Sequence, residues 1–131
     1  MKSIHILGVR IDDVTYDEAV AHADEFLRAG VFHQIATVNP EFVVLAQRHT
    51  EFRRVLNACA LNVPDGVGLL WAARRLGTPL RERVAGQGLV ERLCALAVAH
   101  GGRVFLLGAR AGIAERAARE LQRRHLGLQI G

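Results

Sequence analysis

Two kinds of hydrophobic pattern alternate along the chain, and they predict alternating strands and helices. Short apolar or alternating runs, which are typical of strands, occupy residues 3–12, 33–39, 60–63 and 103–108. Longer runs with helical spacing predict helices at residues 15–30, 40–49, 50–59, 68–77, 89–102 and 109–125. Residues 126–131 look like the start of one more strand. This alternation is typical of an α/β fold with a mainly parallel sheet between two helical layers.

Residues at the ends of these runs make the assignment more specific. Thr15, Asn39 and Thr50 are predicted helix N-caps, and Pro40 suits the first position of a helix. Residues 103–108 are apolar almost throughout, so we expect them to form a central strand covered on both faces. The sequence therefore predicts a three-layer Rossmann-like domain with a short N-terminal hairpin.

The composition fits one compact domain. The chain has 131 residues, of which 50% are hydrophobic, so a substantial core is expected. The net charge is +4, and Lys2 is the sole lysine among 17 basic residues. This charge would suit an anionic ligand, but an arginine-rich proteome explains the total equally well. Cys59 and Cys94 form no metal-binding or CxxC spacing and are expected to be buried free thiols in a reducing compartment.

Several function classes find no support in the sequence. The N-terminus has no signal-peptide pattern, and no apolar run reaches the roughly 20 residues of a membrane span, so we expect a cytoplasmic protein that meets a membrane only at its surface. The six histidines show no ligand spacing, which argues against a metal site. Interleaved aromatic residues are lacking, which argues against nucleic acid, and Trp71 is expected on a buried helix face.

The candidate chemistry lies where predicted strands end. Ligands of α/β sheets bind beyond the carboxyl ends of the strands. Three of these ends carry polar or glycine-rich sequence, at residues 37–39, 65–68 and 108–112. Their common position raises the significance of each.

Asp65 has two interpretations. It can cap the helix predicted to start near Val67, or it can act as a general base on an attacking hydroxyl group. Gly66 would let backbone and ligand approach closely. Thr37 and Asn39 are likewise either an ordinary strand residue and a helix cap, or groups that hydrogen-bond a polar ligand.

Cations and glycines near these ends suit a diphosphate. Arg81 and Arg83 lie in a polar connection predicted over residues 78–88, which also contains Gly86. Surface arginines are often merely solvated, yet the guanidinium fork matches phosphate geometry. Gly108 begins a segment whose backbone amides could hold a phosphate at a helix start.

The order of these motifs resembles the WecG/TagA/CpsF family of bacterial glycosyltransferases. The most specific pieces are T-x-N-P-E at residues 37–41, D-G-x-G at 65–68 followed by W-A-A-R-x-L-G at 71–77, E-R-V-x-G at 82–86, and F-L-L-G at 105–108. The resemblance covers nearly the whole chain. It implies a single glycosyltransferase domain over residues 1–131, which we expect to be incomplete at its C-terminus because the family continues with another strand.

The resemblance also implies a reaction. Such enzymes transfer a sugar, typically N-acetylmannosamine, from a UDP-sugar to an undecaprenyl-diphosphate-linked saccharide, with inversion and without a metal or other cofactor. By motif, Asp65 matches the base, Thr37 and Asn39 match the donor pocket, and Arg83 matches the residue near the diphosphate. Gly66, Gly86 and Gly108 complete the predicted substrate-binding set.

The resemblance places the protein at the inner face of the bacterial plasma membrane, where its lipid-linked acceptor would lie. The sequence leaves the oligomeric state open, a homo-oligomer included. Gly88 departs from the family, which usually has an acid there, and glycine has no side chain to supply the helix cap or substrate contact of that acid. A non-catalytic nucleotide-binding module, or an inactive fragment, is the alternative. A third hypothesis is a Rossmann oxidoreductase, which is disfavoured because the dinucleotide-binding motif G-x-G-x-x-G is missing.

Overall fold

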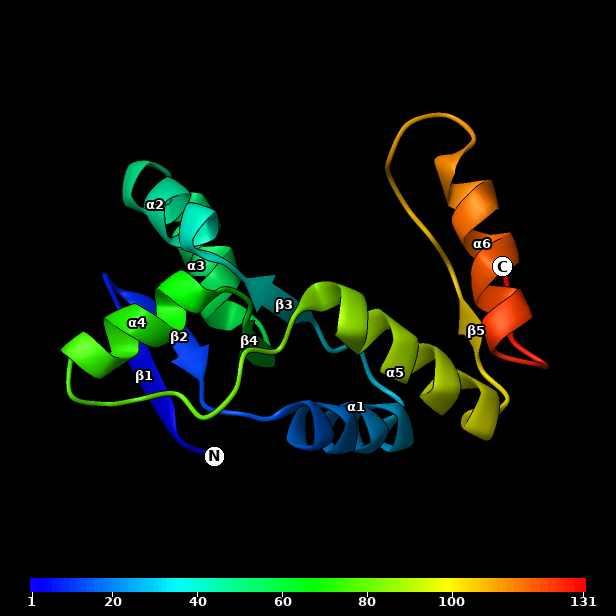
Figure 1. Cartoon of the computed structure of the whole chain (residues 1–131), viewed down its shortest axis with the longest axis horizontal. Coiled ribbons are helices and arrows are strands. Elements are labelled where there is room, and N and C mark those ends of the chain that lie inside the picture. The colour runs from blue at the N-terminus through cyan, green and yellow to red at the C-terminus, as the bar shows by residue number, and fades with distance from the viewer. The chain divides into compact units, whose positions relative to one another are not determined.

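The computed structural model describes residues 1–131, which form two compact units, Met1–Gly86 and Gln87–Gly131 (Figure 1). The first unit contains β1 (Ser3–Ile6), β2 (Val9–Asp12), α1 (Tyr16–Ala29), β3 (Ile35–Val38), α2 (Pro40–Arg48), α3 (Thr50–Ala58), β4 (Leu61–Pro64) and α4 (Val67–Arg75). Helix α5 (Gly86–His100) starts at the last residue of this unit, and the second unit continues with β5 (Arg103–Val104), α6 (Ile113–Arg124) and β6 (Gln129–Ile130).

The strands form three two-stranded sheets. Strands β1 and β2 are antiparallel, which confirms the predicted N-terminal hairpin. Strands β3 and β4 are parallel, and so are β5 and β6, each pair being joined through helices. The prediction of an α/β chain with mainly parallel pairing is therefore confirmed. The strands stay in three separate pairs, however, where one continuous sheet was expected.

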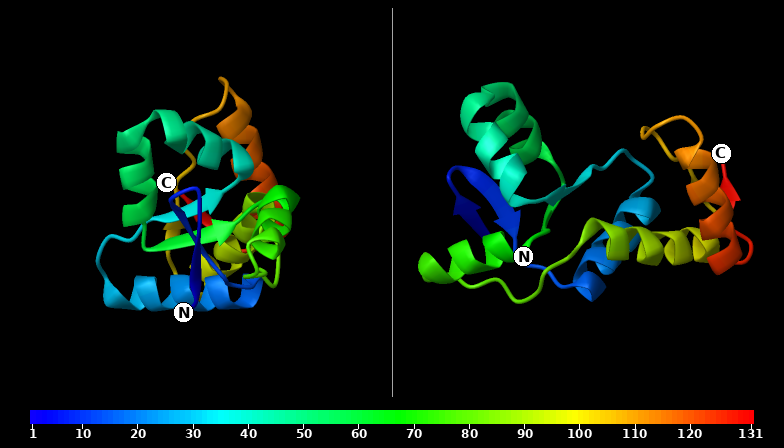
Figure 2. Two further views of the ribbon diagram at one scale, coloured as in Figure 1. Left: turned by 90° about the vertical axis from the view of Figure 1, so that its left-hand side faces the viewer. Right: turned by 45° about the horizontal axis from the view of Figure 1, so that its top comes forward.

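The core of the first unit lies between the hairpin, the β3–β4 pair and the helices around them. In two views α2 and α3 lie on one side of the β3–β4 pair and α1 lies on the other (Figures 1 and 2). Helix α3 packs against β2, and α4 packs against β1. The most deeply buried apolar members of the core are Val9, Ile11, Val38, Ala46 and Ala73. Alternate residues of the short strands thus supply the core, as their sequence pattern predicts.

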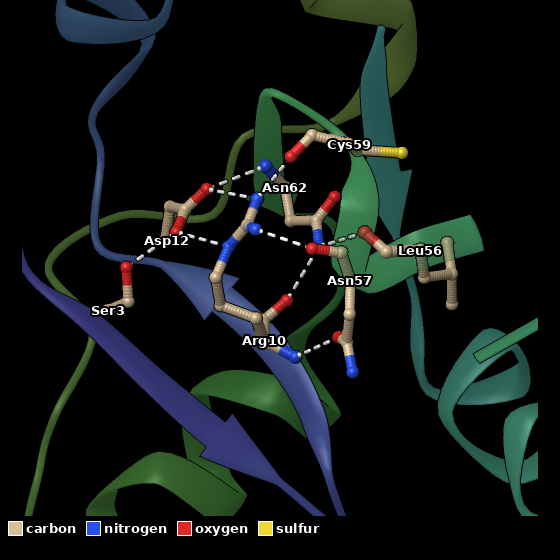
Figure 3. Close-up of polar contacts among 7 residues, drawn as sticks. All are labelled: Ser3, Arg10, Asp12, Leu56, Asn57, Cys59 and Asn62. Atoms are coloured by element: carbon tan, nitrogen blue, oxygen red, sulfur yellow. Dashed lines mark hydrogen bonds and ion pairs between the residues drawn. The ribbon is translucent and has the colours of Figure 1, made fainter. Parts of the chain in front are cut away.

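A buried carboxylate joins the hairpin to β4 (Figure 3). Asp12 is fully buried and accepts hydrogen bonds from the Ser3 hydroxyl at 2.7 Å and from Arg10 Nε at 3.0 Å. Its other oxygen accepts the backbone N–H of Asn62 at 2.8 Å. The Asp12 side chain therefore accepts from a backbone N–H of β4 that would otherwise be buried without a partner. These hydrogen bonds offset the free-energy cost of burying the carboxylate.

Helix boundaries agree with the sequence in two of three predicted caps. Thr15 accepts the N–H of Glu18 at 3.2 Å, and Asn39 accepts the N–H of Phe42 at 2.9 Å. The prediction for Thr50 is wrong, because Thr50 is already the first residue of α3 and His49 is the cap. Helices α2 and α3 are separated by His49 alone, so the chain has no room for a further non-helical residue.

The second unit has a small core and an ion-pair cluster. Cys94, Leu121 and Leu128 are its buried residues. Glu91 on α5 lies 2.6 Å from Arg124 and 2.7 Å from His125, which joins α5 to the end of α6. The hydrogen bond from His125, followed by the one from Arg124, lowers the pKa of Glu91. Burial raises the pKa of the Cys94 thiol, as it does for Cys59, and both cysteines are free and buried as predicted.

Two predictions of burial are wrong. The strand expected over residues 103–108 is reduced to the two residues of β5, with β6 as its partner, and Phe105 and Leu107 are exposed. Trp71, expected on a buried face, is exposed on α4 with the Arg75 guanidinium over its ring at 5.6 Å. An apolar side chain favours burial, but whether it is buried depends on whether another part of the chain packs over it. None of the helices combines the length and apolar character that crossing a membrane requires.

Candidate active site

The candidate site lies at the carboxyl ends of β3 and β4. In the parallel register Val38 stands opposite Pro64, so both strands end at the same level. The backbone N–H of Asp65 donates to the Val38 carbonyl at 2.8 Å and extends the pairing by one residue. Asn39 and Asp65, 26 positions apart in the sequence, therefore leave neighbouring strands side by side. This is the edge at which parallel sheets bind ligands.

The Asp65 carboxylate faces the connection between α4 and α5. The Gly86 N–H donates to its Oδ2 at 3.2 Å, and Arg83 Nη2 lies 3.5 Å from its Oδ1. The side chain is 22% exposed, so solvent and a substrate can both reach it. An ionised carboxylate can accept several hydrogen bonds. Asp65 therefore keeps acceptor capacity for a substrate hydroxyl group.

The capping interpretation of Asp65 is wrong. The N-cap of α4 is Gly66, and no side chain caps this helix. Gly66 has φ +149°, and a Cβ atom there would lie 2.9 Å from Cδ of Pro40. A glycine is thus required for the close approach between the starts of α2 and α4, and the turn directs the Asp65 side chain toward Gly86 instead of toward the helix.

Thr37 and Gly86 meet beside Asp65. A Cβ atom built on Gly86 would lie 3.4 Å from Thr37 Cγ2, 3.5 Å from Thr37 Oγ1 and 3.7 Å from Asp65 Oδ2. Any larger residue at Gly86 would fill the space between the two side chains. The polar connection was predicted to run to residue 88. It ends at residue 85, because Gly86 is the first residue of α5.

Asn39 lies at the same edge of the β3–β4 pair. Its Oδ1 is used by the cap of α2, as the structural interpretation expects. Its side-chain amide N–H groups remain able to donate to a ligand. The cap and the ligand-binding roles are compatible, and the structure confirms the first.

The two arginines of the connection have different environments. Arg81 donates to Asp13 through its backbone N–H at 3.0 Å and through Nε at 3.2 Å, and its Nη1 lies 2.7 Å from Glu18. The hydrogen bond from Arg81 is the main cause of a lowered pKa at Glu18. Arg81 is therefore engaged in holding the fold, while Arg83 faces Asp65.

Gly108 belongs to the second unit. It follows β5, in the loop before α6, and has φ +102°. The helix start predicted at residue 109 lies later, at Ile113, with Gly112 as its cap. The structure thus brings together Thr37, Asn39, Asp65, Gly66, Arg83 and Gly86 in the first unit, while the role of Gly108 stays a prediction.

Sequence reasoning missed Tyr16. Its hydroxyl group accepts the N–H of Ala85 at 2.8 Å and lies 3.4 Å from the carbonyl oxygen of the same residue. Nothing in the local sequence distinguishes Tyr16 from an ordinary first-turn helix residue, because its partner lies 69 positions away. No group of three or more His, Cys, Asp or Glu side chains is arranged to hold a metal ion.

Comparison with known proteins gives one consistent result. Residues 4–131 match the model of the glycosyl transferase WecG/TagA/CpsF family. Among curated relatives, the N-acetylglucosaminyldiphosphoundecaprenol N-acetyl-beta-D-mannosaminyltransferases of Staphylococcus aureus strains NCTC 8325 / PS 47 and COL are each 33% identical over 124 residues. Each alignment covers 93% of this chain and 49% of the relative, so the chain spans about half the length of these relatives. The chain belongs to the WecG/TagA/CpsF family of glycosyl transferases.

Proposed function

We propose that this chain carries the catalytic base of an inverting, metal-independent glycosyltransferase. The enzyme would move a sugar, N-acetylmannosamine or a related one, from a UDP-sugar to an undecaprenyl-diphosphate-linked saccharide in cell-surface polysaccharide synthesis. The observation that carries this proposal is the partly exposed Asp65 carboxylate at the β3–β4 edge, with Arg83 and Gly86 beside it. The relatives from Staphylococcus aureus, which by name act on a diphosphoundecaprenol-linked acceptor, support the substrate class.

In the proposed reaction Asp65 takes the proton of the attacking acceptor hydroxyl. The acceptor oxygen forms a bond to C1 of the donor sugar as the bond from C1 to the β-phosphate oxygen breaks. UDP leaves with the electron pair of that bond. A single displacement of this kind inverts C1 and needs one base, with no covalent enzyme intermediate.

The leaving UDP gains negative charge, which the site must stabilise. Arg83 is the cation closest to the proposed base and has 52% of its side chain exposed, so its guanidinium can swing to a diphosphate. We assign Thr37 and Asn39 to the donor sugar or nucleotide. Gly66, Gly86 and Gly108 would let backbone approach the ligand, Gly108 at its own loop.

We also propose the wider setting predicted from the sequence. We propose a three-layer Rossmann-like domain over residues 1–131. The parallel β3–β4 and β5–β6 pairs, each with a helical connection, are the strand–helix–strand motifs typical of such a domain. The protein would work in the cytoplasm, peripherally at the inner face of the plasma membrane, because its acceptor is anchored there by a lipid. Homo-oligomer formation is compatible with this setting.

The test is sugar transfer by the product of the complete reading frame, using UDP-N-acetylmannosamine and an N-acetylglucosaminyl-diphospholipid. Asp65→Asn removes the base and keeps the size of the side chain. We expect kcat to fall by about 10²–10⁴-fold, the usual contribution of a general base. The affinity for UDP, measured by calorimetry, should stay unchanged.

Glu51→Gln is the matched control, because Glu51 is an exposed carboxylate on α3 that pairs only with neighbouring Arg54. Its turnover should equal that of the natural protein. Full turnover of Asp65→Asn would refute the assignment of the base. UDP binding by the natural protein without any transfer would favour the alternative, a non-catalytic nucleotide-binding module.

A further inference from the structure

The connection that carries Arg83 and Gly86 is held by the start of α1. Arg81 is bound to Asp13 and Glu18, as described above. The backbone N–H of Tyr16 donates to Glu82 Oε1 at 3.1 Å. These contacts hold the beginning of the connection, before it reaches Asp65.

The end of the connection is held by the Tyr16 hydroxyl group and by β4. The Ala85 N–H donates to Tyr16 Oη at 2.8 Å, and the Val84 N–H donates to the Pro64 carbonyl at 2.7 Å. Successive residues are therefore hydrogen-bonded to two different elements. Of these two partners, Tyr16 contributes a side-chain hydroxyl group and Pro64 contributes a backbone carbonyl.

One peptide group links Tyr16 to the proposed base. The Ala85 carbonyl and the Gly86 N–H belong to the same planar peptide unit, so their directions are fixed relative to each other. The carbonyl lies 3.4 Å from Tyr16 Oη, and the N–H donates to Asp65 Oδ2 at 3.2 Å. Fixing this plane from the Tyr16 side therefore fixes where the Gly86 N–H points and which oxygen of Asp65 it binds.

We propose that Tyr16 is a positioning residue for Asp65, acting through the Ala85–Gly86 peptide. This inference rests on the proposed function, because it assumes that Asp65 is the base. By holding Oδ2 on the Gly86 N–H, the peptide leaves Oδ1 turned to the substrate side beside Arg83. Loss of the hydroxyl group would let the peptide rotate and the carboxylate leave its productive orientation. Misorientation of a catalytic group lowers the rate of the chemical step.

The test is Tyr16→Phe, which keeps the ring and removes the hydroxyl group, in the product of the complete reading frame. We expect kcat to fall by about tenfold to a hundredfold. The KM for the UDP-sugar should change little, because the contacts on either side of Arg83 remain: Arg81 still binds Asp13, and the Val84 N–H still donates to Pro64. Rates are normalised to the UDP-binding stoichiometry from calorimetry, so that misfolded protein is not counted as slow enzyme.

A double-mutant cycle separates positioning from a general loss of structure. In Asp65→Asn protein the Tyr16→Phe change should cause no further loss, because the group on which Tyr16 acts is already gone. Asn57→Ala is the matched control: like Tyr16, Asn57 makes two hydrogen bonds through its side chain, here to Arg10 and Gly8 of the hairpin. Its normalised kcat should be unchanged.

The proposal is overturned if Tyr16→Phe keeps full kcat, if its effect persists in Asp65→Asn protein, or if Asn57→Ala causes an equal loss. Failure of the proposed function has a different signature. In that case Asp65→Asn itself would keep full turnover, whatever Tyr16→Phe does.

Discussion

Asp12 is the last residue of β2 and Asp65 directly follows β4, a strand of another sheet that contacts β2, yet their surroundings differ sharply. Asp12 is fully buried and accepts hydrogen bonds from Ser3, Arg10 and Asn62. Asp65 is partly exposed, accepts one N–H from Gly86, and has Arg83 at 3.5 Å. The first carboxylate is satisfied by the protein, while the second can still accept from a ligand. Unused hydrogen-bonding capacity, more than residue type or position after a strand, marks the candidate for chemistry.

The largest expected effect is on stability at Asp12. Asp12→Ala would remove the carboxylate that pairs with the Arg10 guanidinium and would leave the buried Asn62 N–H without its acceptor, so we expect a loss of about 3–5 kcal/mol in the free energy of unfolding. Asp65→Ala should cost about 1 kcal/mol, the value of one ordinary hydrogen bond. Urea unfolding of both variants measures the difference. Equal losses would show that the two carboxylates are both structural.

Arg81 and Arg83, the two arginines of the connection between α4 and α5, should differ in the same sense, with smaller magnitudes, because Arg81 has structural partners while Arg83 lies beside Asp65. Arg83→Lys loses the guanidinium fork, so we expect about tenfold weaker UDP binding, or about 1.4 kcal/mol, with unchanged stability. Arg81→Lys should leave UDP affinity unchanged and lower stability only slightly, because its ion pairs with Asp13 and Glu18 are partly exposed. Calorimetry with UDP and urea unfolding measure both. Weaker UDP binding in Arg81→Lys would contradict this division of roles.

The smallest effect concerns Glu120, a carboxylate with strong partners but little burial. Hydrogen bonds from Arg123 and Arg124 lower the pKa of Glu120 to about 2, from its usual 4.5. Because the folded pKa is the lower one, any stabilisation is fully present above pH 4.5 and is lost as the pH falls toward 2. Carboxyl NMR titration should give a midpoint near 2 that rises in Arg123→Gln.

High salt provides the control for Glu120. Since all three side chains are at the surface, 1 M salt should raise the midpoint in the natural protein, and the stability at pH 7 should barely change in Glu120→Gln. A large destabilisation by Glu120→Gln would contradict the view that partners without burial contribute little.

Local sequence predicted most element positions because their signals are local. Alternating residues 3–12 and the apolar spacing of the helices were sufficient to place the hairpin and the helices. Asn39 before Pro40 predicted the start of α2, since the cap bonds a residue three positions on. Local signals failed where glycine was involved: Gly86 and Gly88 suggested a connection because glycine has a low helix propensity, yet both belong to the first turn of α5.

Other features depended on contacts distant in sequence. Residues 103–108 are apolar, yet their hydrophobicity does not specify a pairing strand, and β5 is two residues long. The family motif singled out Arg83, but residue type and local position do not distinguish it from Arg81, and only their distant partners show that Arg81 is bound within the fold. The family motifs pointed to Asp65, Thr37 and Arg83, but they gave no indication of Tyr16.

The sequence by itself determined which segments are strands and helices, where most of them end, and that polar residues gather at strand ends. These properties depend on backbone preferences and on apolar spacing over a few residues. Only the tertiary structure decided that the protein uses the acceptor capacity of Asp12 but leaves part of that of Asp65 available. It also decided that Tyr16 reaches the peptide beside Asp65. Hydrogen-bond partners 21 to 69 positions apart are brought together by packing, and no local pattern encodes which acceptors packing leaves available.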